Sequence, residues 1–227
     1  MTGVQTCALP ISGNCHTERD AATGVMVYRY GSHIFHTRFL DHPQIEVRLA
    51  EKFSPARCAE FAHVFFPGPI DAFFNFQHGR LSYRTVTFER HEAEGDFQGT
   101  SVVNYTDLRV THTRIHEFKH YTRWEKHDRT VAFSAFSHDT GERDIPYYPV
   151  RRPADKVLLK KYCTLAAETR AVSFLGRLAT YRYVDMHNVI AESLDFATAF
   201  LQAYHAKSTS LPGFTPLVAE TIRNQIV

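Results

Sequence analysis

The stretch Gly176-Arg-Leu-Ala-Thr-Tyr-Arg-Tyr-Val-Asp-Met-His-Asn-Val-Ile190 decides the fold, because it joins a predicted strand to a predicted helix. A short apolar run, residues 172–175, precedes it, and Gly176 then allows a sharp backbone turn. Asp185 is placed to cap the helix, whose free N–H groups can face a phosphate or a cofactor edge. Apolar residues recur at the helical period on its predicted buried face: Met186, Val189, Ile190, Leu194, Ala197 and Leu201.

Working outward from this junction, the pattern changes twice. The apolar run 61–66 has the length of a buried parallel strand, and Pro67-Gly-Pro-Ile-Asp71 ends it before a predicted helix start. Regular alternation with polar breaks then predicts an antiparallel sheet, with strands at 82–88, 100–105, 113–121 and 130–136.

Other segments are predicted more briefly. Alternation predicts strands over 25–30 and 45–49, and residues 208–216 are predicted to form a loop. Pro153 and Asp155 open a predicted helix with one apolar face, formed by Leu158, Leu159, Tyr162, Leu165 and Ala166.

Composition limits the classes of partner. The 227 residues are 44% hydrophobic and 22% charged, with a formal net charge of +2, so neither a nucleic acid nor a membrane surface is indicated as a partner. No apolar run approaches the roughly 20 residues that span a bilayer. The four cysteines show no C-x-x-C or zinc spacing, which favours a reducing compartment, and we expect a cytoplasmic protein.

Fourteen histidines raise the question of a metal site. His112, His116 and His120 would share one face of a helix and could then bind zinc or nickel. The β-branched and aromatic residues around them favour a strand, in which the three side chains are too far apart to share an ion. We therefore predict no metal ligands.

Five stretches, in order along the chain, resemble one family. Besides residues 176–190 they are Tyr30-Gly-Ser-His-Ile-Phe-His-Thr37, Gly68-Pro-Ile-Asp71, Asn104-Tyr-Thr-Asp107 continuing to Thr113-Arg-Ile115, and Pro146-Tyr-Tyr-Pro-Val150. Together they resemble the UDP-galactopyranose mutases, from Gly13 to about Leu201. Met1–Ile11 instead resembles a translated sequencing adaptor, so we exclude residues 1–12 from fold reasoning.

The resemblance implies an α/β fold, in which a partial FAD-binding Rossmann-like domain is combined with an antiparallel β-sheet substrate domain. Residues 13–80 and 151–206 are expected to form the FAD-binding part, 81–150 the substrate domain and 207–227 a tail. The family's helical subdomain is missing after residue 37. No G-x-G-x-x-G motif, which holds the pyrophosphate in such domains, occurs in the chain.

The resemblance also implies site residues. A nucleotide diphosphate needs cationic fork donors and hydroxyl donors, and the matching positions are Asn104, Arg114, Tyr148 and Tyr183. Catalytic roles fall to Arg177, Asp185 and His33, and the glutamate that accompanies the aspartate is replaced here by Ala135. The expected cofactor-binding residues are Asn14, His33, Ile34, Gly176, Arg177, Met186, His187, Asn188, Val189, Ile190 and Ala191.

The implied activity is interconversion of UDP-galactopyranose and UDP-galactofuranose for cell-surface glycans. It uses reduced FAD, with NAD(P)H as external reductant, and UDP-galactose is the substrate partner. Full-length members are expected to be able to form homodimers. Two alternatives stay open: a non-catalytic fragment that cannot hold FAD, and a histidine-rich metal-binding protein.

Overall fold

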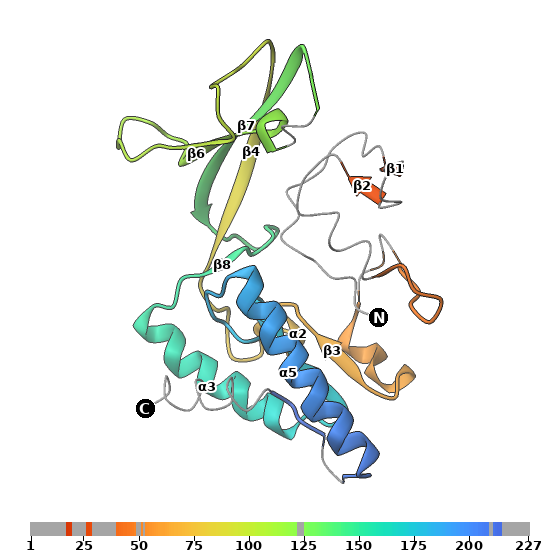
Figure 1. Cartoon of the computed structure of the whole chain (residues 1–227). Helices are drawn as coiled ribbons and strands as arrows, with labels where there is room; N and C mark the ends of the chain where they lie inside the picture. The colour runs from red at the N-terminus through yellow and green to blue at the C-terminus, as the bar shows by residue number, and fades with distance from the viewer. Residues whose placement is uncertain are drawn as a thin grey trace. The chain divides into compact units, whose positions relative to one another are not determined.

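The computed structural model (Figure 1) describes residues 17–19, 26–28, 40–48, 51, 53–121, 125–208 and 211–214. The chain divides into two compact units. Of the described residues, the first unit takes 48–85 and 139–214, and the second takes 17–47 and 86–138, with the gaps just given.

The first unit contains a pair of parallel strands, β3 (Val64–Phe66) and β9 (Val172–Phe174). The pair aligns Val64 with Val172 and Phe66 with Phe174, which confirms the expectation that the run at 61–66 supplies a parallel strand. The strand starts only at Val64, because Pro55 opens a 3-10 helix, η1 (Pro55–Glu60), just before it. The short helix α2 (Ile70–Phe73) follows β3, as predicted.

Helices pack on the two faces of this strand pair. On one face, α3 (Pro153–Glu168) joins the main apolar core through Leu159, Tyr162 and Ala166. On the other, Phe65 packs against α5 (Met186–His205), with ring centroids 6.1 Å from Phe196 and 5.0 Å from Phe200. Because successive strand residues point to opposite faces, Phe65 and Phe66 serve different layers.

The predicted apolar face of α5 is wrong in its second half, although Val189 and Ile190 at its start are half-buried. Phe196 is 1% exposed, whereas Leu194 is 65% exposed and Leu201 and Ala197 also face solvent. Buried and half-buried residues recur instead at Val189, Phe196, Phe200 and Ala203, so beyond Val189 the inward side differs from the predicted one. Two phenylalanines bury more apolar area than the leucines do, so they decide which side of the helix turns inward.

Hydrogen bonds tie the start of α3 to two segments distant in sequence. The Asp155 carboxylate accepts hydrogen bonds from the Arg152 backbone N–H (2.7 Å), the Ser82 hydroxyl (2.9 Å) and the Tyr181 hydroxyl (2.9 Å). Asp155 is buried, so these donors compensate for its lost hydration. They hold the start of α3 to the segments at Ser82 and Tyr181.

A five-stranded sheet has the order β5-β6-β7-β4-β8, and it confirms the predicted antiparallel sheet. Its strands are β4 (Tyr83–Glu94), β5 (Val102–Asn104), β6 (Arg114–Glu117), β7 (Arg129–Asp139) and β8 (Tyr148–Pro149). The strand predicted at 113–121 ends early, at Glu117, and continues as the 3-10 helix η2 (Phe118–Tyr121). The segment predicted as a strand at 45–49 has no regular structure over 45–48, where Val47 lies exposed.

Two short strands complete the described elements. The backbones of β1 (Thr17–Arg19) and β2 (Met26–Tyr28) pair antiparallel, which confirms a strand within 25–30. No helix among the described residues is long and apolar enough to cross a bilayer. Within the described ranges the parallel sheet has two strands, and a Rossmann-like FAD-binding domain stays a prediction.

Candidate functional site

The junction after β9 begins with the backbone turn predicted from the sequence. Gly176 has a φ of +81°, a conformation that side-chain-bearing residues rarely adopt, and it opens the one-turn helix α4 (Gly176–Ala179). A loop from Thr180 leads to Asp185, the N-cap residue of α5. The strand and the long helix are therefore joined by a short helix and a loop, not by a single turn.

Three predicted site residues meet at this junction. The Arg177 guanidinium lies 5.2 Å from the ring centroid of Tyr148 and 5.3 Å from that of Tyr183. The two tyrosine rings stack on each other with centroids 5.7 Å apart. Tyr183 is 63% exposed, so this arginine–tyrosine cluster (Arg177, Tyr148 and Tyr183) is accessible from solvent. A cation over two aromatic faces is held in place without losing its charge.

A hydrogen bond to the backbone also fixes the Arg177 guanidinium. Arg177 Nη2 donates a hydrogen bond of 3.1 Å to the carbonyl of Val184, in the loop that leads into α5. The cluster therefore consists of one oriented cation and two phenol hydroxyls. A guanidinium can bind two oxygens of an anion bidentately, and each phenol hydroxyl can donate one further hydrogen bond to it.

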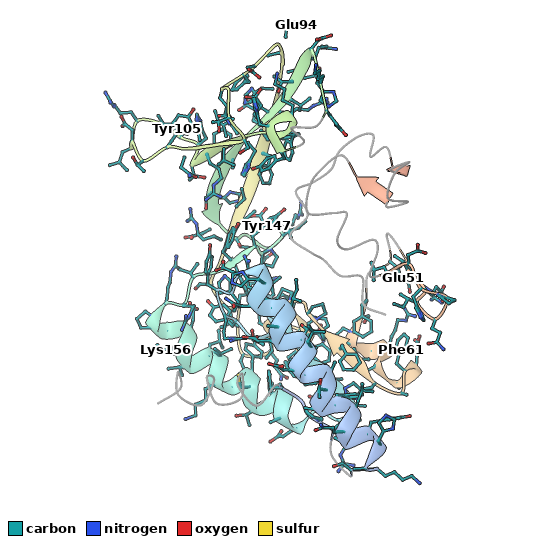
Figure 2. The ribbon with its side chains drawn as sticks, viewed as in Figure 1. Glu51, Phe61, Glu94, Tyr105, Tyr147 and Lys156 are labelled. Atoms are coloured by element: carbon teal, nitrogen blue, oxygen red, sulfur yellow. The ribbon has the colours of Figure 1, made fainter. Side chains whose placement is uncertain are left out.

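The strand bearing Tyr148 adds residues that the sequence did not suggest. Tyr148 is the Cα partner of Arg84 across β8 and β4, and the preceding Tyr147, labelled in Figure 2, donates its backbone N–H to the Arg84 carbonyl (2.9 Å). Arg84 Nη1 pairs with Asp139 Oδ1 at 2.9 Å, and Arg152 Nη2 with Asp139 Oδ2 at 3.1 Å. Hydrogen bonds from Arg84 and Arg152 lower the pKa of Asp139. The placement of Arg84 beside Tyr148 becomes apparent only from the register of β4 and β8.

Asp185 occupies the predicted N-cap position, but its side chain makes no capping hydrogen bond. The expected capping role is therefore wrong, although the helix begins where it was predicted. Asp185 is exposed, and the N–H groups of the first turn of α5 have no acceptor within the helix.

The residues expected at the cofactor are only partly described. Gly176 and the backbone from Met186 to Ala191 form the turn and the first turns of α5, with His187 and Asn188 exposed. A helix N-terminus with free N–H groups fits an electron-rich ring edge. Asn14, His33 and Ile34 lie outside the described residues.

A second set of predicted residues lies on the sheet of the other unit. Asn104 on β5 is the Cα partner of Arg114 on β6, which in turn is the partner of Ala135 on β7. Directly opposed residues in antiparallel strands point to the same face, so these three side chains form one row. Asn104 and Arg114 are exposed, and Ala135 is 2% exposed.

The three histidines predicted not to form a metal site have separate surroundings. His112 packs against Tyr105, with ring centroids 4.5 Å apart, and His116 Nδ1 lies 2.9 Å from the Tyr121 hydroxyl. His120 lies instead beside Asp96 and Glu117, the group that the described residues offer for a cation.

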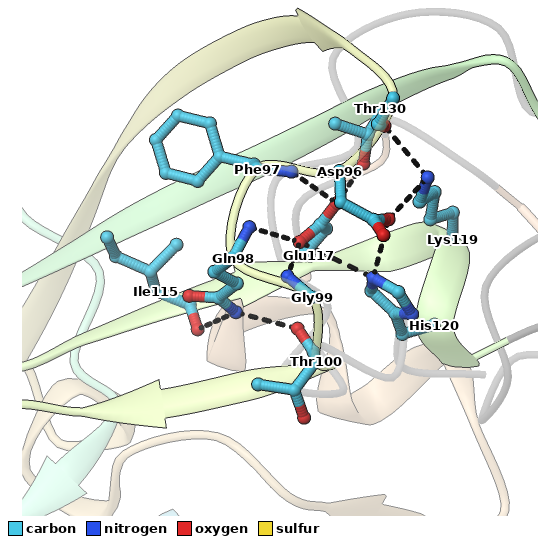
Figure 3. A network of polar contacts seen from close by, with 11 residues as sticks. Asp96, Phe97, Gln98, Gly99, Thr100, Ile115, Glu117, Lys119, His120 and Thr130 are labelled. Carbon is cyan, nitrogen blue, oxygen red and sulfur yellow. Dashed lines mark hydrogen bonds and ion pairs between the residues drawn. The ribbon is translucent and has the colours of Figure 1, made fainter.

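That group has little capacity left for an ion (Figure 3). The Glu117 carboxylate already accepts hydrogen bonds from the backbone N–H groups of Phe97 (2.9 Å) and Gln98 (2.8 Å) and from the Thr130 hydroxyl (2.7 Å). The Lys119 ammonium pairs with the Asp96 carboxylate and supplies the positive charge that a metal would bring. We assign this group a structural role.

Comparison with known proteins identifies the family of the chain. The sequence pattern of the UDP-galactopyranose mutases matches residues 24–183. A probable UDP-galactopyranose mutase from Klebsiella pneumoniae is 45% identical over 175 residues, which cover 77% of this chain and 45% of the relative. The chain belongs to the UDP-galactopyranose mutase family.

Two further relatives match a similar share of the chain. The dTDP-fucopyranose mutase of Escherichia coli is 41% identical over 72% of this chain, and the UDP-galactopyranose mutase of Mycoplasma pneumoniae is 34% identical over 73%. The match covers 45% of the length of each of these two proteins as well. The chain therefore spans about half the length of the curated relatives it matches.

Both sets of predicted site residues belong to a chain of the UDP-galactopyranose mutase family. The structure brings Arg177, Tyr148 and Tyr183 together in the first unit, and it aligns Asn104 with Arg114 in the second. UDP-galactopyranose mutases are isomerases, so both sets belong to a chain of isomerase ancestry.

Proposed function

We propose that the chain is part of a flavin-dependent UDP-galactopyranose mutase, which interconverts UDP-galactopyranose and UDP-galactofuranose for cell-surface glycans. The observation that carries the proposal is the arginine–tyrosine cluster, in which Arg177 lies 5.2 and 5.3 Å from two stacked tyrosine rings. The two tyrosine hydroxyls of the cluster support a site for the charged leaving group of a nucleotide sugar, and Arg177 is assigned to the adjoining cofactor. The proposed location is the cytoplasm, and a homodimer is the proposed assembly of the full-length enzyme.

The proposed division of labour separates substrate from cofactor. Tyr148, Tyr183, Arg114 and Asn104 bind the nucleotide sugar, and their task is to hold the diphosphate while negative charge develops on it. Arg177 and Asp185 act beside the cofactor, together with His33. Residues 81–150 form the substrate domain, residues 13–80 and 151–206 the cofactor part, and residues 207–227 a tail.

FAD fits one end of the proposed cofactor site. Gly176 and the N-terminus of α5, from Met186 to Ala191, would hold the edge of the flavin ring, because backbone N–H groups meet its carbonyl there. When bound in its reduced form, with NAD(P)H as the external reductant, FAD supplies the nucleophile for the sugar's anomeric carbon. The chain itself contributes orientation and charge.

The second candidate is a non-catalytic member that does not retain FAD. Two observations favour it: the sequence contains no G-x-G-x-x-G motif, and Ala135 stands where the family's glutamate is expected. A glycine turn and a helix dipole normally fix the pyrophosphate of such cofactors. We accordingly expect this polypeptide to bind FAD weakly or not at all.

Purification with FAD followed by gel filtration and an absorbance spectrum separates the two candidates. Stoichiometric flavin in the eluted protein, with conversion of UDP-galactofuranose under reducing conditions, supports the mutase. Loss of flavin with retained UDP binding supports the non-catalytic member. A parallel assay with dTDP-fucose tests the sugar nucleotide of the Escherichia coli relative.

A further inference from the structure

The loop between β4 and β5 surrounds a buried carboxylate (Figure 3). Three successive backbone N–H groups, those of Phe97, Gln98 and Gly99, point at the Glu117 side chain from 2.9, 2.8 and 3.2 Å. Successive amides that converge in this way form a concave anion-binding site. Here the anion belongs to the protein itself, and we call the loop 96–99 with Glu117 the carboxylate nest.

Glu117 stays ionised inside this nest. Its side chain is 0% exposed, and desolvation alone would raise its pKa. The hydrogen bonds from Phe97, Thr130 and Gln98 outweigh desolvation and hold the pKa of Glu117 below its ordinary value. The carboxylate is therefore a charged acceptor for the loop at neutral pH.

The nest continues directly into the edge strand β5. The Gln98 side-chain amide donates to the carbonyls of Thr100 (2.8 Å) and Ile115 (3.1 Å), and the Glu117 backbone N–H donates to Ser101 (2.9 Å). Among the strands that the structure describes, β5 has three residues and stands at the edge of the sheet, beside β6. A strand of three residues makes few ladder hydrogen bonds, so the hydrogen bonds at its entry help to hold it in place.

That strand carries one of the proposed substrate residues. β5 ends at Asn104, which is the Cα partner of Arg114 on β6. Arg114 and Glu117 stand three positions apart on β6, so their side chains leave opposite faces of the sheet. Glu117 is thus separated by the sheet from any ligand at the Arg114 row.

We propose that Glu117 is a positioning residue, which fixes the spacing of Asn104 and Arg114 through the carboxylate nest and β5. Because the substrate role of that pair rests on the proposed function, the inference needs a readout that requires no ligand. The side-chain NMR resonances of Arg114 Nε–Hε and Asn104 Nδ2–Hδ2 in the full chain provide one.

The test compares Glu117→Gln with Asp96→Asn as the matched control. Asp96→Asn removes an exposed carboxylate from the same network but leaves the three N–H bonds to Glu117 intact. Glu117→Gln should speed amide exchange over residues 97–104 by about tenfold or more and shift the Arg114 and Asn104 side-chain resonances. It should also weaken UDP binding by about fivefold, whereas Asp96→Asn changes each quantity by less than about twofold.

Unchanged Arg114 and Asn104 resonances in a folded Glu117→Gln protein would overturn the inference, even if the loop amides exchanged faster. If UDP binds to no form of the chain, the proposed function fails, but the resonances still decide the role of Glu117. Should Glu117→Gln not fold, Thr130→Val removes one of the carboxylate's donors and should produce the same shifts at smaller amplitude. Its failure to move them would count equally against the proposal.

Discussion

Arg114 on β6 lies directly opposite Ala135 on β7, with the Thr113 backbone N–H donating to the Ala135 carbonyl at 2.8 Å. The resemblance to UDP-galactopyranose mutases places a glutamate at position 135, so the register identifies which cation that carboxylate would face. On that resemblance, Ala135 leaves Arg114 without an acidic partner directly opposite it on β7.

Ala135→Glu should restore this pair. Opposite charges facing each other across antiparallel strands contribute about 0.2–1 kcal/mol, so the effect on stability should be small. The effect on turnover should be larger, at least about tenfold, because the added carboxylate changes the charge of the site. Rates are measured with UDP-galactofuranose in a form joined to the segments of the Klebsiella relative that the match does not cover. Ala135→Gln, which adds similar volume without charge, should give no such increase.

Arg114→Ala and Arg177→Ala should separate substrate from cofactor roles in the same joined form. Removing one partner of a desolvated, hydrogen-bonded charge pair costs about 2–5 kcal/mol. Arg114→Ala should therefore lower kcat/KM for UDP-galactofuranose by at least about tenfold while flavin content stays unchanged. Arg177→Ala should reduce flavin content. Steady-state kinetics and flavin absorbance are measured on both variants. Flavin loss in Arg114→Ala with normal kinetics per bound flavin would show that the roles are assigned the wrong way round.

The packing of α5 makes a matched pair of substitutions informative. Phe196 is buried against Phe65, so Phe196→Ala should lower the free energy of unfolding by about 3–5 kcal/mol. Leu194→Ala, two residues away on the exposed side, should change it by less than about 0.5 kcal/mol. Urea unfolding followed by circular dichroism measures both. Equal losses would mean that the helix packs on the face first predicted from the sequence.

Glu117 should make stability depend on pH in a definite direction. Its pKa is lowered in the folded state from an ordinary value of 4.5, so its contribution is present above that pH and is lost as the pH falls through the folded value. Glu117→Gln should lower the free energy of unfolding at pH 7 by about 1–3 kcal/mol, and the difference should narrow below pH 4.5. Urea unfolding over a pH series measures this difference.

Asp71 provides a control, because its contribution to stability should change with pH in the opposite direction. Burial raises the pKa of Asp71 above its ordinary value of 3.8, so its contribution is greatest below that pH and is lost as the pH rises through the folded value. The difference between the parent chain and Asp71→Asn should therefore shrink with rising pH over the range in which that of Glu117→Gln grows. If the two stability differences changed with pH in the same direction, the environments assigned to Glu117 and Asp71 would be wrong.

Local patterns predicted the elements that depend on local chemistry. Pro153 marks the first residue of α3, Gly176 supplies the positive φ that its position requires, and alternation located four strands of the sheet. These features follow from backbone geometry and side-chain period, which a sequence displays directly.

Features that depend on distant partners were not predictable in the same way. Tertiary contact with Phe65 decided which face of α5 is buried, and the buried Glu117 could not be distinguished from an ordinary strand residue before the loop 96–99 was seen around it. The cross-strand pair of Arg84 and Tyr148 likewise needs the register of β4 and β8. The lone segment at 45–48 alternates as a strand does, but alternation alone does not supply a partner strand.

Titration of the chain with UDP, followed through the aromatic ring resonances of Tyr148 and Tyr183, tests the central proposal most directly. Arg177 lies over both rings, so a bound diphosphate should shift both resonances together and saturate with a Kd below about 1 mM. Tyr183→Phe removes one hydroxyl donor and should weaken the binding by about fivefold or more. Absence of saturable shifts at these two tyrosines, with UDP well above that concentration, would contradict the assignment of Tyr148 and Tyr183 to a nucleotide sugar.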